Sequence, residues 1–131
     1  MGPQLLLVDD EPELLYALSI RLRVAGFEVV TAANGSEALT KLEQASPDVI
    51  VTDLLMPDMD GYELCRRLKA DARLAKIPVI VLTALSETTV VNRMNELRAE
   101  RVVYKLAGPG ELLASIREVL SARTQGGMPH G

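Results

Sequence analysis

The sequence has almost no cysteine and no long apolar segment. Cys65 is the single cysteine among 131 residues, so an internal disulfide and a cysteine-based zinc site are both excluded. No apolar run approaches the roughly 20 residues that a membrane span needs. The amino-terminal residues also lack the basic flank of a signal peptide. These absences favour a protein of the reducing cytoplasm, with no membrane partner.

Basic residues are fewer than acidic ones. Fourteen Lys and Arg against eighteen Asp and Glu give a net charge of -4, which argues against nucleic acid as a direct electrostatic partner. The apolar share of 48% is ordinary for a soluble globular domain, and the length predicts one domain.

Short apolar runs bounded by turn residues alternate with longer amphipathic segments. Valine- and isoleucine-rich runs such as VIV and IPVIVL are typical of strands buried on both faces. The predicted strands are Leu5–Val8, Val29–Val30, Val49–Val51, Ile77–Leu82 and Val102–Tyr104. Strict alternation of five strands with five helices predicts an α/β fold, with a parallel sheet covered by helices on both faces.

Capping and stop residues locate the predicted helices. The first helix should stop at Gly26, and the other four should begin at Asn34, near Asp60, near Ser86 and at Pro109. Glu37 follows Asn34 and Glu63 follows Asp60 by three residues, as in a capping box. The fourth helix should continue to Leu97. From Arg123 the sequence loses its periodicity, so we expect one domain over 1–122 and a disordered tail or linker stub over 123–131.

Chemically active side chains fall where the predicted strands end. Asp9 and Asp10 follow the first run, Asp53 the third, Thr83 the fourth and Lys105 the fifth. Ligands of open parallel sheets bind at the carboxyl ends of the strands, so these side chains should converge. Three neighbouring carboxylates repel unless a cation lies between them, and oxygen ligands select a hard ion such as Mg²⁺.

The same set suits the transfer of a phosphoryl group. Asp53 could act as the nucleophile, because carboxylates form acyl phosphates. The Lys105 ammonium and the Thr83 hydroxyl could then hold phosphoryl oxygens.

The segments LLLVDDEPE, VTDLLMPDMDGYEL, VIVLTA and VVYK, in this order and spacing, resemble the receiver domain of two-component response regulators, the CheY-like superfamily. The resemblance covers roughly residues 4 to 122. It implies a flavodoxin-like doubly wound fold with strand order 2-1-3-4-5. It also implies a phosphorylated signalling module rather than a turnover enzyme.

The resemblance assigns a role to each residue of the set. Asp53 would accept the phosphoryl group from a sensor histidine kinase or a phosphotransfer protein. Asp10, Asp53 and the backbone carbonyl of Leu55 would ligate Mg²⁺, and Asp9 would act largely through water. Lys105 would pair with the phosphoryl group.

The resemblance also implies a switch. Thr83 would bond the phosphoryl group in the active form, and that movement would change a surface that binds an effector domain or a protein target. Ala84 fits the small residue that follows the switch hydroxyl, and Gly61 matches the loop after the phosphoacceptor.

Two positions depart from the family pattern. Val102 stands where receivers usually carry Tyr or Phe, and Tyr104 should share its face if the strand is regular. Leu106 stands where the family has a proline joined by a cis bond. A cis bond before leucine would cost about 2.5–4 kcal/mol, so we expect a trans bond and a differently shaped loop.

Two alternative hypotheses follow. A pseudo-receiver would keep the fold and bind proteins without phosphorylation, as the changes at Val102 and Leu106 would allow. A hydrolase of the haloacid dehalogenase type would need a second aspartate where this chain has Leu55.

Two further predictions concern single side chains. Leu55 and Leu85 are apolar and cannot orient an attacking water, so we expect slow dephosphorylation. Tyr62 is expected to be exposed.

Overall fold

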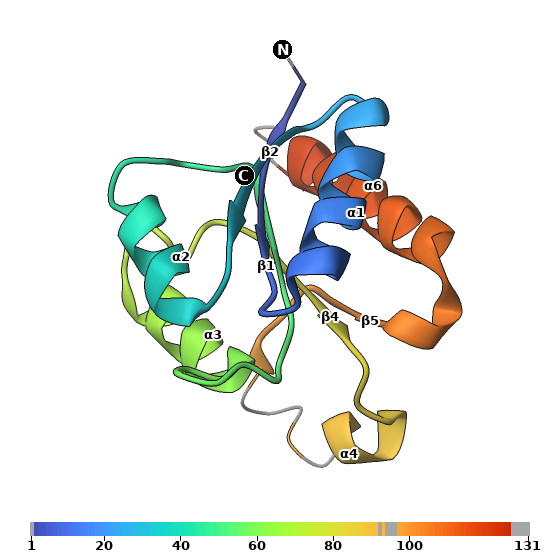
Figure 1. Ribbon diagram of the computed structural model, residues 1–131. Coiled ribbons are helices and arrows are strands. Elements are labelled where there is room, and N and C mark those ends of the chain that lie inside the picture. The colour runs from blue at the N-terminus through green and yellow to red at the C-terminus, as the bar shows by residue number, and fades with distance from the viewer. Residues whose placement is uncertain (1, 92, 94–96, 127–131) are drawn as a thin grey trace.

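The computed structural model describes residues 2–91, 93 and 97–126. Five parallel strands form one sheet in the order β2-β1-β3-β4-β5, as the family resemblance implied (Figure 1). Their bounds are Gln4–Val8 for β1, Glu28–Ala32 for β2, Val49–Thr52 for β3, Val79–Thr83 for β4 and Arg101–Tyr104 for β5. The order reverses between β1 and β3, and open parallel sheets bind their ligands at the carboxyl ends of the strands at such a point.

Helices cover both faces of the sheet, as Figure 1 shows. Helices α1 (Pro12–Val24) and α6 (Pro109–Gly126) lie on one face, and α2 (Gly35–Leu42) and α3 (Gly61–Ala70) lie on the other. The short helix α4 (Glu87–Val91) follows β4. In the part of the chain that the structure describes, no helix has both the length and the apolar character to cross a membrane.

The central strands are buried on both sides. In β3, Val49 and Val51 pack in the core that contains α1 and α6 side chains, whereas Ile50 packs in the core on the α2 and α3 side. All three are fully buried. The alternation of side chains along a strand therefore fills two separate cores, and this explains why these runs contain apolar residues at every position.

The predicted caps are present. The Asn34 side chain accepts a hydrogen bond from the Glu37 amide at 2.8 Å, and Asp60 does the same for the Glu63 amide at 2.8 Å. Both residues satisfy backbone donors that a helix start leaves unpaired. Gly26 ends the turn after α1 at a φ of 106°, a conformation that favours glycine.

The two carboxyl-terminal helices differ from the prediction. Helix α4 spans only Glu87–Val91, and residues 92 and 94–96 of the predicted helix lie outside the described part. Helix α6 continues to Gly126, so the predicted start of the tail at Arg123 is too early. The helix can continue past the end of the apolar periodicity because each residue added to an existing helix gains a backbone hydrogen bond. The rest of the expected tail, 127–131, lies outside the described residues. The limits of the domain stay a prediction.

Candidate functional site

The ends of β1 and β3 bring two aspartates together. Asp9 and Asp53 directly follow these neighbouring strands, whose last residues, Val8 and Thr52, are paired in register. The Asp53 amide donates a hydrogen bond to the Val8 carbonyl at 3.0 Å, which extends the ladder by one residue. Both aspartates are buried, with 2% of Asp9 and 5% of Asp53 exposed. The sheet therefore places two carboxylates at its switch point.

Asp10 completes an acidic cluster with this pair. One carboxylate oxygen from each of Asp9, Asp10 and Asp53 lies within 4.8 Å of the other two. Asp10 itself is exposed, so the cluster opens to solvent on one side. A donor set made only of carboxylate oxygens fits a hard cation such as Mg²⁺, which keeps several waters when it binds few carboxylates.

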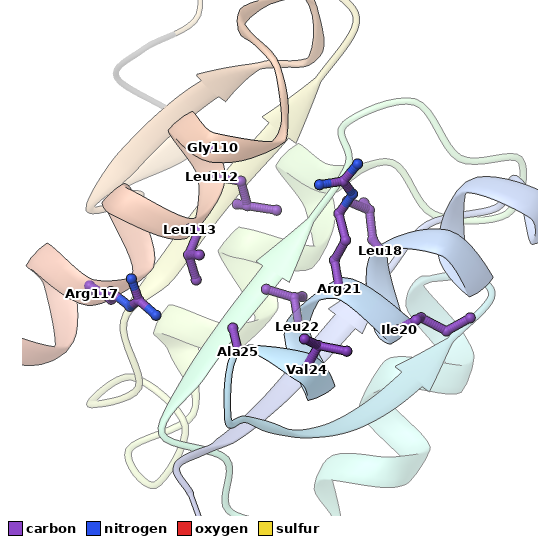
Figure 2. Close-up of a pocket in the computed structure, with 10 residues that line it drawn as sticks. All are labelled: Leu18, Ile20, Arg21, Leu22, Val24, Ala25, Gly110, Leu112, Leu113 and Arg117. Carbon is purple, nitrogen blue, oxygen red and sulfur yellow. The ribbon is translucent and has the colours of Figure 1, made fainter.

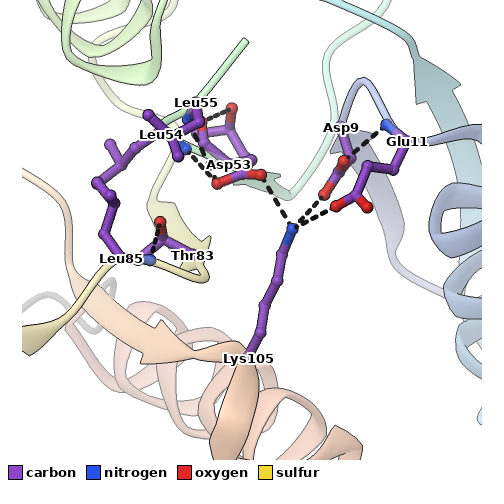
Figure 3. Close-up of polar contacts among 9 residues, drawn as sticks. Asp9, Glu11, Asp53, Leu54, Leu55, Thr83, Leu85 and Lys105 are labelled. Atoms are coloured by element: carbon purple, nitrogen blue, oxygen red, sulfur yellow. Dashed lines mark hydrogen bonds and ion pairs between the residues drawn. The ribbon is translucent and has the colours of Figure 1, made fainter.

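Lys105 reaches this cluster from the end of β5 (Figure 3). Its ammonium nitrogen Nζ lies 2.9 Å from Asp53 Oδ2, 3.1 Å from Asp9 Oδ2 and 3.3 Å from Glu11 Oε1. Sequence reasoning missed Glu11. Its position directly after the two aspartates was the available signal, because residues that follow a strand end line the same edge.

The loop after β3 fixes the other oxygen of Asp53. The backbone amides of Leu54 and Leu55 donate to Asp53 Oδ1, at 2.6 Å and 3.4 Å respectively (Figure 3). Two amides therefore hold Oδ1 while the ammonium of Lys105 pairs with Oδ2. A carboxylate held in this way has a fixed orientation, which a nucleophile needs.

Gly61 lets helix α3 begin directly against this loop. Its amide donates to the Leu54 carbonyl at 2.9 Å. A Cβ atom at this position would lie 2.4 Å from the Asp53 carbonyl oxygen, so no larger residue fits without a shift of the backbone.

Thr83 ends β4 at the same edge of the sheet. It is fully buried, and its hydroxyl oxygen accepts a hydrogen bond from the Leu85 amide at 3.2 Å. Figure 3 places it beside the Asp53 loop, but the hydrogen bond found for its hydroxyl is to Leu85 and not to Asp53.

Burial has opposite consequences for the acid and the base of the site. Burial raises the pKa of Asp9 above its ordinary value, although hydrogen bonds from the Glu11 amide and from Lys105 act the other way. Burial also opposes the charge of Lys105, but its contacts with Asp53 and Asp9 outweigh this effect and raise the pKa of Lys105. The ammonium therefore does not offset the burial of Asp9, and a divalent cation beside Asp9 would favour its ionised form.

The family model for the response regulator receiver domain matches residues 5–117. The chain belongs to this family. Receiver domains are signalling modules that work with histidine kinases and are not turnover enzymes. The prediction of the family from the sequence is thereby confirmed.

Individual relatives agree with this assignment. The DNA-binding response regulator MtrA of Mycolicibacterium smegmatis is 38% identical over 89% of this chain and 50% of its own length. The receiver domain of a signal transduction histidine kinase from Syntrophus aciditrophicus is 35% identical, with a TM-score of 0.86 over 99% of this chain and 95% of that one. The chain thus spans about half the length of the curated relatives it matches.

A third relative has been crystallised with a metal. The receiver domain of the Pseudomonas aeruginosa sensor histidine kinase PA1611, with a magnesium ion in its active-site cleft, is 26% identical, with a TM-score of 0.85 over 92% of this chain and 99% of that one.

The two departures from the receiver pattern have structural counterparts. Val102 and Tyr104 pack, partly buried, against the same core, so they share one face of a regular β5 as predicted. The bond before Leu106 is trans, also as predicted. The chain turns through a short 3-10 helix, Lys105–Ala107, which leaves Leu106 98% exposed.

The prediction for Tyr62 was wrong. Only 4% of this residue is exposed. Its ring lies 3.7 Å from the guanidinium carbon of Arg93, which comes from the segment after α4 and covers it. Because that contact joins residues far apart in the sequence, the local pattern around Gly61 could not reveal it.

A hollow lies between α1 and α6, away from the acidic cluster (Figure 2). It encloses about 470 Å³, and apolar side chains such as Leu18, Ile20 and Leu113 line it. None of its lining residues belongs to the acidic cluster. Two arginines, Arg21 and Arg117, are its charged lining residues, and no carboxylate, thiol or hydroxyl side chain of the described residues lines it.

Proposed function

We propose that this receiver domain accepts a phosphoryl group on Asp53 in the presence of Mg²⁺. The contact that carries the proposal is the 2.9 Å pair between Lys105 and Asp53, which with Asp9 and Asp10 forms a cluster of three carboxylates. An oriented carboxylate beside a cation is poised to attack an electrophilic phosphorus. The donor would be a sensor histidine kinase or a phosphotransfer protein.

In the reaction, an Asp53 oxygen forms a bond to phosphorus while the bond from phosphorus to the donor atom breaks. The leaving group takes the bonding electron pair. Lys105 pairs with a phosphoryl oxygen, and Thr83 turns its hydroxyl toward another. These two groups compensate the charge that the phosphoryl group brings to a buried site.

Asp9, Asp10, Asp53 and the backbone carbonyl of Leu55 would hold the Mg²⁺ ion, with Asp9 acting largely through water. The ion, when bound, neutralises charge on the phosphoryl oxygens and on the carboxylates that surround it. The 4.8 Å spread of the three carboxylates supports this ligand set, because it leaves room for one cation between them.

We further propose that this receiver domain is cytoplasmic and passes its signal on by binding an effector domain or a protein target. Movement of Thr83 on phosphorylation would alter the surface formed by α4 and β5, which an effector domain or a protein target would read. The net charge of -4 does not favour direct contact with nucleic acid by this part of the protein. A full-length protein that also carries a DNA-binding domain, as the printed name of MtrA implies for that relative, is compatible with this proposal.

Intact-mass measurement after incubation with acetyl phosphate and Mg²⁺ tests the chemistry. The wild-type chain should gain one phosphoryl group, and it should gain none without the metal or as the Asp53→Asn variant. Asp58→Asn is the matched control, since Asp58 is an exposed aspartate of the same loop and should leave the gain intact. A folded wild-type chain that gains no mass under any condition would favour the pseudo-receiver, and the search would turn to partners that bind without phosphorylation.

A further inference from the structure

The ammonium group of Lys105 has no donor to spare in this structure. It carries three N–H donors, and three carboxylates face it, those of Asp53, Asp9 and Glu11. A phosphoryl oxygen that pairs with Lys105 must therefore displace one of these carboxylates or share a donor with it.

Glu11 is the carboxylate that is most easily displaced. Its distance to Nζ, 3.3 Å, is the longest of the three. Its side chain is 64% exposed, whereas those of Asp9 and Asp53 are 2% and 5% exposed. Glu11 also stands at the start of α1 without making a side-chain cap for that helix, so the helix does not hold its carboxylate in place.

We propose that Glu11 is a positioning residue that competes with the phosphoryl group for Lys105 and thereby slows acceptance of that group. The inference rests on the proposed function. With acetyl phosphate as donor, an Asp53 oxygen bonds to phosphorus, the bond from phosphorus to the acetate oxygen breaks, and acetate leaves with the electron pair. The Lys105 ammonium exchanges Glu11 for a phosphoryl oxygen and keeps its proton.

Three substitutions separate this contact from the charge of the region. Glu11→Gln removes the charge and weakens the contact, while Glu11→Asp keeps the charge on a side chain one methylene shorter. Glu13→Gln is the matched control, because Glu13 is an exposed acid in the first turn of the same helix and is not among the three carboxylates that face Lys105. Circular dichroism of each variant verifies the fold.

Two quantities are measured for each chain in Mg²⁺. The first is the initial rate of mass gain with acetyl phosphate, and the second is the affinity for beryllofluoride, an analogue of the phosphoryl group, by fluorine NMR titration. Glu11→Gln should raise both the rate and the affinity. The increase should be modest, about two- to five-fold, because an exposed ion pair contributes little free energy. Glu11→Asp should raise both in the same direction, Glu13→Gln should stay near the wild-type values, and added salt should reduce the differences.

Two results would overturn the inference while the proposed function stands. One is an equal gain in Glu11→Gln and Glu13→Gln, which would assign the effect to net charge. The other is a Glu11→Asp variant with wild-type rate and affinity, which would show that the contact itself has no effect. A wild-type chain that neither gains mass nor binds beryllofluoride would overturn the proposed function, and this inference with it.

Discussion

Replacement of Gly61 by alanine should destabilise the domain through the backbone around the phosphoacceptor. The added Cβ would lie 2.4 Å from the Asp53 carbonyl oxygen and 2.8 Å from the Leu54 Cα. Real Cβ atoms do not approach other atoms so closely. Because both neighbours are backbone atoms, a change of rotamer cannot relieve the overlap, and either α3 or the loop after β3 must move.

The size of the effect follows from two opposing terms. Overpacking of a close contact costs about 1–3 kcal/mol, and the better helix propensity of alanine offsets up to about 1 kcal/mol of it. We therefore expect the free energy of unfolding to fall by about 1–2 kcal/mol. For a domain of this size the melting temperature should fall by roughly 4–8 °C.

Urea unfolding followed by far-ultraviolet circular dichroism measures this loss without a tryptophan, which the chain lacks. Gly110→Ala is the matched control, since Gly110 lies in the first turn of α6 and, apart from its chain neighbours and the nearby backbone of its own helix, no described atom lies within 4 Å of its ideal Cβ. That variant should be as stable as the wild type or slightly more stable. If Gly61→Ala proved equally stable, the close packing of α3 against the loop would be refuted.

Three further predictions concern single side chains. Burial raises the pKa of Cys65 to about 11, so its alkylation by iodoacetamide at pH 8.5 should be about a hundred-fold slower in the native chain than in urea; comparable rates would contradict its burial. The pKa of Asp9 is higher in the native chain than in the unfolded chain, so between these two pKa values native Asp9 keeps a proton that the unfolded chain has lost. The free energy of unfolding therefore falls as the pH rises from the unfolded pKa through the native one. Asp9→Asn should therefore raise the melting temperature of the metal-free chain at pH 7 and reduce the further rise on addition of Mg²⁺; a lower melting temperature without metal would contradict this. Leu55 is exposed beside Asp53 and cannot orient water, so Leu55→Asn or Leu55→Glu should shorten the half-life of the phosphorylated chain severalfold; an unchanged half-life in both variants would reject the idea.

The elements of this fold could be predicted because their signals are local. Apolar runs such as VIV in β3 mark strands buried on both faces, and Asn34, Asp60 and Gly26 mark helix ends through hydrogen bonds and backbone angles within a few residues. The convergence of Asp9 and Asp53 also followed from the sequence, since parallel strands end at the same edge of a sheet. The order of the strands came only from the family resemblance.

Tertiary packing decided the rest. Whether Tyr62 is exposed depends on Arg93, which reaches it from another segment. That Glu11 shares Lys105 with Asp9 and Asp53 depends on the path of a long side chain from the residue after β5, and the spacing of residues in the sequence does not encode that path. The sequence by itself determined which chemistry gathers at the strand ends, because the local pattern marks where each strand ends and parallel strands end at the same edge of a sheet. Only the tertiary structure decided which carboxylates hold the ammonium and how deeply each is buried, because distance and desolvation arise between segments remote in the chain.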